Sequence, residues 1–78
     1  MFNILLLEDD ELFASTVEDF LTEEGFEVDI ASDGEECLEL NFKKNYDLYI
    51  FDINVPKING LELLEQLRTS GDNTPSIF

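Results

Sequence analysis

Residues 4–10 read Ile4-Leu5-Leu6-Leu7-Glu8-Asp9-Asp10, and residues 48–52 repeat the same pattern as Leu48-Tyr49-Ile50-Phe51-Asp52. Each apolar run has the length of a strand that is buried on both faces, as the strands of a parallel sheet are. Functional groups in such sheets gather beyond the carboxyl ends of the strands, so we expect both acidic ends to lie at one edge. Like charges about 4 Å apart repel by roughly 4 kcal/mol at an effective dielectric near 20. The pattern therefore predicts a pocket that binds a cation.

The composition limits the classes of function. The chain has 78 residues, which allows one small domain. Its 19 Asp and Glu against 4 Lys and Arg give a formal net charge of −15. This balance argues against direct binding of nucleic acid or of an anionic membrane, because both need clustered basic side chains. It favours cations and basic protein surfaces as partners.

The cysteine content and the absence of a targeting pattern indicate a compartment. Cys37 is the single cysteine, so no disulfide can form within the chain. The sequence carries no basic-then-apolar leader and no apolar stretch long enough to span a membrane. These features predict a cytoplasmic protein.

Strand and helix patterns alternate along the chain. Apolar runs predict strands over residues 2–7, 26–31 and 47–51, and the beginning of a fourth over residues 76–78. Helical spacing predicts helices over residues 11–24, from residue 34 to residues 43–44, and over residues 61–68. This succession predicts an α/β fold in which right-handed crossovers join parallel strands.

Several residues mark the expected helix ends. Asp10 is the expected N-cap of the first helix and Gly25 its left-handed terminator. Asp33 and Glu36 have the spacing of a capping box at the start of the second helix. We expect Gly60 to permit an unusual backbone angle near the acidic edge.

Apolar stripes predict which side of each helix faces the core. The inward residues expected from helical spacing are Phe13, Val17, Phe20 and Leu21 in the first helix, Cys37, Leu38, Leu40 and Phe42 in the second, and Leu63, Leu64 and Leu67 in the third.

The candidate site contains Glu8, Asp9, Asp52 and Asn54. Oxygen ligands of this kind suit Mg²⁺, which usually takes one or two carboxylates together with phosphate. The chain has no His, and its one Cys lies in a predicted helix, so we expect no zinc or iron site. A carboxylate at a strand end can also act as a nucleophile and form an aspartyl phosphate. Asp52 is the better candidate because it follows a fully apolar strand and precedes an open loop.

Three blocks of sequence carry a resemblance to a known family. The blocks are residues 4–10, the run Ala31-Ser32-Asp33-Gly34-Glu35-Glu36, and residues 47–56 with the run Asn59-Gly60-Leu61-Glu62-Leu63-Leu64. In this order and spacing, the chain resembles the response-regulator receiver domain of two-component signalling.

The resemblance implies a fold, a site and partners. It implies a flavodoxin-like parallel sheet with strand order 2-1-3 and the start of a fourth strand. It implies that Asp52 is the phosphoacceptor, that Glu8 and Asp9 are the acid pair holding Mg²⁺, and that the backbone carbonyl of Asn54 is a further ligand. The partners implied are a sensor histidine kinase or phosphotransfer protein and an output domain in the parent protein. The chain would be a signalling domain rather than an enzyme.

The sequence also departs from the family pattern. Receiver domains run to roughly 120 residues, so we expect residues 1–78 to be a receiver domain without its C-terminal third. The family's hydroxyl residue on the fourth strand and lysine on the fifth have no counterpart here, and Lys57 lies in a different loop. We therefore expect weak Mg²⁺ binding, poor phosphorylation, and self-association that covers an open sheet edge.

Three other interpretations compete with this one. Acids after the first strand can simply decorate a helix N-terminus, where each gains only about 0.3–1 kcal/mol. An aspartate-nucleophile phosphatase needs a general acid two residues after the nucleophile, and Asn54 cannot transfer a proton there. A fragment that binds only cations or a protein partner, and no longer switches, is the remaining alternative.

Overall fold

A computed structural model describes residues 1–53, 55 and 57–78. In the described residues, four parallel strands form one sheet in the order β2-β1-β3-β4. The strands are β1 (Asn3–Leu7), β2 (Glu27–Ala31), β3 (Leu48–Phe51) and β4 (Ser76–Ile77). The helices between them are α1 (Glu11–Glu23), α2 (Gly34–Lys43) and α3 (Gly60–Thr69). The predicted α/β fold, its 2-1-3 order and its fourth strand are confirmed. The expectation that the third strand would form the open edge of the sheet is wrong, because β4 pairs with β3.

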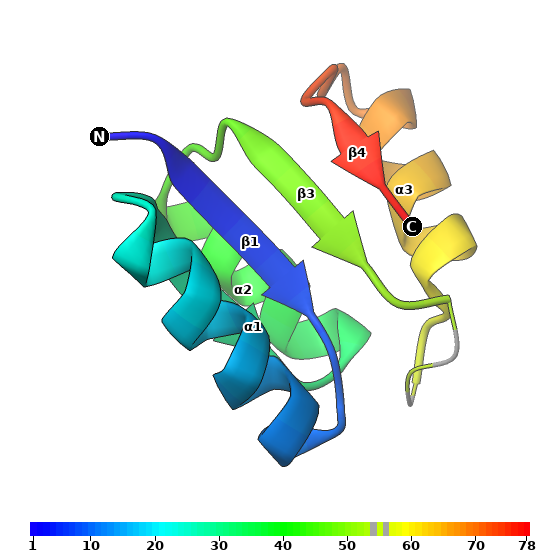
Figure 1. Ribbon diagram of the computed structural model, residues 1–78. Coiled ribbons are helices and arrows are strands. Elements are labelled where there is room, and N and C mark those ends of the chain that lie inside the picture. Colours follow the sequence, from blue (N-terminus) through cyan, green and yellow to red (C-terminus); the bar gives the residue numbers. More distant parts are fainter. Residues whose placement is uncertain (54, 56) are drawn as a thin grey trace.

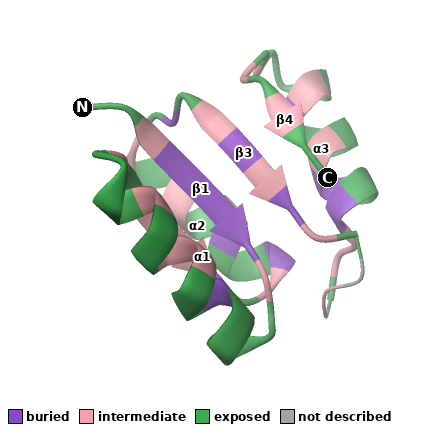
Figure 2. Cartoon of the chain, viewed as in Figure 1, coloured by how far each residue is buried: buried purple, intermediate pink, exposed green. Residues whose placement is uncertain are grey.

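The helices cover both faces of the sheet. Helix α1 lies on one face, while α2 and α3 lie on the other, as Figure 1 shows. β1 lies between β2 and β3 and is buried along most of its length, which explains its continuous apolar sequence (Figure 2). No helix in the described parts of the chain has the length and hydropathy needed to cross a bilayer.

The core lies between the sheet and the pair α2 and α3. It is formed by Leu5, Leu7, Ala31, Cys37, Tyr46, Tyr49, Phe51, Leu63 and Leu67. Complete burial of an aliphatic or aromatic side chain of this size contributes roughly 1.5–3 kcal/mol each. Burial also raises the pKa of the Cys37 thiol to about 12, so this cysteine serves as a small apolar core residue.

The helix ends follow the predicted caps. The Asp10 carboxylate accepts the Phe13 N–H at 3.1 Å, and the Asp33 carboxylate accepts the Glu36 N–H at 2.9 Å. Gly25 has a φ of 93°, the left-handed conformation expected after a helix.

One cap was not predicted. Asn59 precedes α3, and its side chain accepts the Glu62 N–H at 2.9 Å. The spacing of Asn59 and Glu62 is that of a capping box and was the signal available for it.

Three aromatic side chains expected in the core are instead exposed. Phe13, Phe20 and Phe42 are 56%, 63% and 94% exposed. In α1 the buried residue is Ala14, whereas Phe13 borders an open hollow beside the sheet residues Leu6 and Ile50. Phe42 falls on the side of α2 away from the core, because five helical positions separate it from the buried Cys37.

Arg68 supports the connection between α3 and β4. Its guanidinium donates to the carbonyl oxygens of Asp72 at 2.9 Å and Thr74 at 2.7 Å, and to the Ser76 hydroxyl at 3.3 Å. Tyr49 lies on β3, and its hydroxyl donates to the Asp72 carboxylate in this connection. These contacts fix β4 beside β3.

Candidate functional site

The backbone of the sheet places two acids at neighbouring strand ends. The Glu8 N–H donates to the Ala31 carbonyl at 2.9 Å, and the Asp52 N–H donates to the Leu7 carbonyl at 2.9 Å. Both bonds continue the sheet one residue beyond its strands. Glu8 and Asp52 are therefore held at the same edge, as the sequence predicted from the carboxyl ends of parallel strands.

Three of the four predicted site residues come together. Glu8, Asp9 and Asp52 each offer a carboxylate oxygen, and these oxygens lie within 4.8 Å of one another. Glu8 and Asp9 can share this site because β1 ends at Leu7 and the chain then turns toward α1. Asn54 lies outside the described residues.

The Glu8 carboxylate lies in an environment that disfavours its charge. The pKa of Glu8 is raised above its ordinary value, first because burial removes the carboxylate from water, and then because Asp52 and Asp9 repel it. The Asp10 N–H opposes this effect by donating to Glu8 at 3.1 Å. A divalent cation in this pocket would relieve both the repulsion and the loss of hydration.

Gly60 lies directly against the backbone of Asp52. A Cβ atom built on Gly60 would lie 2.4 Å from the Asp52 carbonyl oxygen, far inside normal contact. The φ of Gly60 is not positive, in contrast to Gly25 and Gly71, so the expected unusual backbone angle is wrong. Glycine is required here because the start of α3 and the end of β3 approach so closely.

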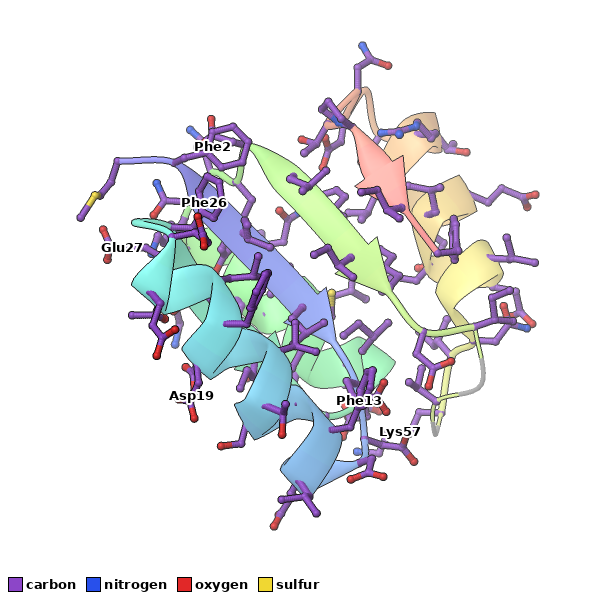
Figure 3. The ribbon with its side chains drawn as sticks, in the orientation of Figure 1. Phe2, Phe13, Asp19, Phe26, Glu27 and Lys57 are labelled. Carbon is purple, nitrogen blue, oxygen red and sulfur yellow. The ribbon has the colours of Figure 1, made fainter. Side chains whose placement is uncertain are left out.

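Lys57 joins the loop after Asp52 to the start of α2. Its Nζ lies 3.5 Å from the Asp33 carboxylate and 3.3 Å from the Glu35 carboxylate, at the edge of the fold where β1 ends (Figure 3). The side-chain contacts with Glu35 and Asp33 raise the pKa of Lys57. Sequence reasoning missed this contact, because more than twenty residues separate the partners and no local spacing links them.

An apolar hollow of about 360 Å³ borders the acidic edge. Its walls are formed by the side of α1 that carries Phe13 and Val17, by Leu6 and Ile50 of the sheet, and by Phe78. Glu8 and Asp52 line its end. The exposed position of Phe13 is explained by this hollow, which no other described element fills.

Comparisons with known proteins agree with the fold. A family model described as the response regulator receiver domain matches residues 4–78. The response regulator ArlR of Staphylococcus epidermidis is 47% identical over 78 residues, which are all of this chain and 35% of that protein. This chain thus spans about a third of the length of that curated relative.

Solved structures give the same picture. The receiver domain of the Francisella response regulator 1452 superposes with a TM-score of 0.94 at 33% identity, covering 97% of this chain and 63% of that one. TrrA from Thermotoga maritima, in complex with Mg²⁺ and BeF, superposes with a TM-score of 0.85 at 41% identity, covering 91% of this chain and 62% of that one. TrrA in complex with the histidine kinase ThkA superposes with a TM-score of 0.89 at 38% identity, covering 97% of this chain and 66% of that one.

Proposed function

This chain belongs to the family of response regulator receiver domains, and from that premise we propose that Asp52 accepts a phosphoryl group with Mg²⁺ held at Glu8 and Asp9. The observation that carries the proposal is the convergence of three carboxylate oxygens within 4.8 Å at the ends of β1 and β3. Receiver domains are signalling domains, so the reaction at Asp52 would serve a switch rather than turnover of a metabolite.

The chemistry of the donor set fits Mg²⁺. The ion takes hard oxygen ligands, keeps several waters and needs only one or two carboxylates from a protein. Asp9 is exposed, whereas Glu8 and Asp52 are half-buried, so the pocket is open on the side from which a phosphoryl donor must approach. The pKa of Glu8 is raised first by burial and then by repulsion from Asp52 and Asp9, and a bound cation would counter both effects. We further propose the Asn54 carbonyl as a ligand, on the family resemblance alone.

Asp52 would act as the nucleophile. One of its carboxylate oxygens attacks the phosphorus of a phosphohistidine, the O–P bond forms as the N–P bond breaks, and the electron pair of the broken bond returns to the imidazole. The apolar strand β3 and the hydrogen bond from the Asp52 N–H to Leu7 hold this residue in place. When bound, Mg²⁺ offsets the negative charge of the phosphoryl oxygens.

The partner that delivers the phosphoryl group would be a sensor histidine kinase or a phosphotransfer protein. The structure of TrrA with the kinase ThkA is of a relative that binds such a partner. Leu12 and Phe13, at the start of α1 beside the acidic edge, are 80% and 56% exposed. These apolar side chains offer a contact surface next to Asp52. By analogy with transcriptional regulators such as CtrA of Caulobacter vibrioides, the parent protein would carry an output domain.

A phosphorylation assay tests the proposal. The chain is treated with a small phosphodonor, with and without Mg²⁺, and intact mass spectrometry follows a base-labile phosphoryl adduct. We expect a Mg²⁺-dependent adduct that is absent in Asp52→Asn, an isosteric variant that keeps the fold but lacks the nucleophile. Labelling that persists in Asp52→Asn would refute the assigned nucleophile. Labelling of neither protein would favour the interpretation as a non-switching fragment.

A further inference from the structure

The loop after Asp52 contains an unusual backbone conformation. Lys57 has a φ of 74° and is the one non-glycine residue with positive φ in the described parts of the chain. A side chain with a Cβ pays a steric cost in this region, and such residues persist where the surrounding structure holds them. Strain of this kind often occurs where a loop is kept in position for function.

One partner of Lys57, Asp33, is held in place by a hydrogen bond within α2. Asp33 uses one carboxylate oxygen to cap α2 through the Glu36 N–H, at 2.9 Å, and its other oxygen faces Lys57. The Glu36 side chain in turn accepts the Ser32 N–H at 2.7 Å. The first turn of α2 is therefore fixed by its own caps, so Lys57 binds a prearranged partner. The pKa of Asp33 is lowered, first by the Glu36 N–H and then by the charge of Lys57.

Ile58 adds a close apolar contact at the same place. A Cβ atom built on Gly34 would lie 2.8 Å from the Ile58 Cβ, so the loop rests directly on the first residue of α2. Ile58 is partly buried against the core. At the other end of the loop, the Gly60 N–H donates to the Ile53 carbonyl at 3.1 Å. Ile53 and residues 57–60, which are described parts of this connection, are thus held by contacts with α2 and with the start of α3.

We propose that Lys57 and Ile58 form a latch on the first turn of α2, and that Lys57 is a positioning residue for the metal and phosphoryl chemistry at Asp52. This inference rests on the proposed function and adds to it the residue that holds its loop. The latch couples α2, which contributes no ligand, to the acidic edge. Lys57 acts by holding the loop in position through its ion pairs with Asp33 and Glu35, and not by a direct electrostatic effect on the metal site.

The sign of a charge substitution separates the latch from simple electrostatics. If Lys57 acted only through long-range electrostatics, removing its positive charge would strengthen Mg²⁺ binding, because like charges repel. If Lys57 holds the loop in place, removing it should weaken Mg²⁺ binding. We therefore expect Lys57→Gln to bind Mg²⁺ about two- to fivefold more weakly at low salt, the size of effect that exposed ion pairs have. Stronger or unchanged binding would overturn the proposal.

The experiment is a Mg²⁺ titration of the ¹⁵N-labelled chain followed by NMR, at low and high ionic strength. Lys57→Arg keeps both ion pairs and should restore most of the affinity. Lys43→Gln removes one exposed positive charge from the far end of α2 and is the matched control, expected to bind at least as tightly as wild type. The deficit of Lys57→Gln should shrink in high salt, because exposed charges are then screened. A deficit of equal size at both salt concentrations would refute the ionic part of the latch.

A second variant disturbs the latch without changing charge. Gly34→Ala places a methyl group against Ile58 and should weaken Mg²⁺ binding equally at low and high salt. Wild-type affinity in Gly34→Ala would refute the apolar part of the latch.

A metal-free measurement distinguishes failure of the latch from failure of the proposed function. Amide hydrogen exchange of residues 57–60 should be faster in Lys57→Gln than in wild type or Lys43→Gln. If Mg²⁺ does not bind at Asp52, because Asp52→Asn leaves the titration unchanged, the proposed function fails, and the positioning role fails with it. If Mg²⁺ binds at Asp52 but exchange in Lys57→Gln is unchanged, the latch alone fails.

Discussion

Replacing Gly60 with alanine should displace Asp52 while leaving the fold intact. The new Cβ would start 2.4 Å from the Asp52 carbonyl oxygen and 3.1 Å from its carbonyl carbon. Real Cβ atoms essentially never approach closer than 3.0 Å, so one of the two backbones must move by at least 0.6 Å. Both partners are backbone atoms, and no flexible side chain can absorb the shift.

Two opposing effects set the change in stability. Alanine is more favourable than glycine in a helix by about 0.8–1.0 kcal/mol, whereas overfilling a packed site costs typically about 1–3 kcal/mol. The net loss should be about 0–2 kcal/mol, and 1 kcal/mol corresponds to a fall of about 4–8 °C in Tm for a domain of this size. The effect on the site should be larger, because a shift of about 0.5 Å already exceeds the tolerance of a functional constellation. We expect roughly tenfold weaker Mg²⁺ binding, since misplacement by 1 Å can cost about 100-fold.

Thermal unfolding and Mg²⁺ titration of the same samples test this reasoning. Gly25→Ala is the matched control: a Cβ there meets nothing within 4 Å, but the φ of 93° makes alanine unfavourable. The control should lose stability, by about 1–2 kcal/mol, and bind Mg²⁺ like wild type. Gly60→Ala with wild-type affinity and a higher Tm would show that the close approach to Asp52 imposes no constraint.

Three further outcomes are expected. In Glu8→Gln without metal, Tm at pH 7 should rise and Mg²⁺ affinity should fall. The pKa of Glu8 is raised in the folded protein, so its contribution to stability is present below its ordinary pKa and is lost as pH rises through its pKa in the folded protein. A lower Tm would contradict this. Tyr49→Phe removes the hydroxyl that donates to Asp72 and should lower the free energy of unfolding by about 1 kcal/mol, measured in urea; an unchanged midpoint would exclude a stabilising bond. Sedimentation at high micromolar concentration should reveal self-association, because the outer edge of β4 has no neighbouring strand among the described residues and Ile77 is 54% exposed. Ile77→Lys should reduce this self-association, and a monomeric wild-type protein would contradict the prediction.

The sequence was sufficient to predict the acidic edge. Strands buried on both faces leave a strong signal, and the carboxyl ends of parallel strands must meet, so Glu8 and Asp52 could be placed together before any coordinates. The caps at Asp10 and Asp33 were equally predictable, because a cap depends on residues within one turn.

Features that depend on the surroundings of an element were not predictable. Helical spacing groups Phe13 and Phe20 on one side of α1, but whether another element covers that side depends on the tertiary fold, and both side chains stay exposed. The role of Gly60 was misjudged for the same reason, because a glycine is required there by the close approach of the Asp52 backbone, which follows a different element. The pairing of Lys57 with Asp33 depends on the path of a loop, which no periodicity encodes.

The contacts of Arg68 bear on how freely the turn before β4 can vary. Its guanidinium reaches mainly carbonyl oxygens, which every type of amino acid supplies. Substitutions at Asn73 or Pro75 would therefore leave these acceptors in place, whereas loss of Arg68 would remove its three hydrogen bonds at once. A library randomised at Asn73 and Pro75 should therefore tolerate many residues as long as Arg68, Asp72 and Thr74 are retained, because the side chains of these three residues form the hydrogen bonds of the turn.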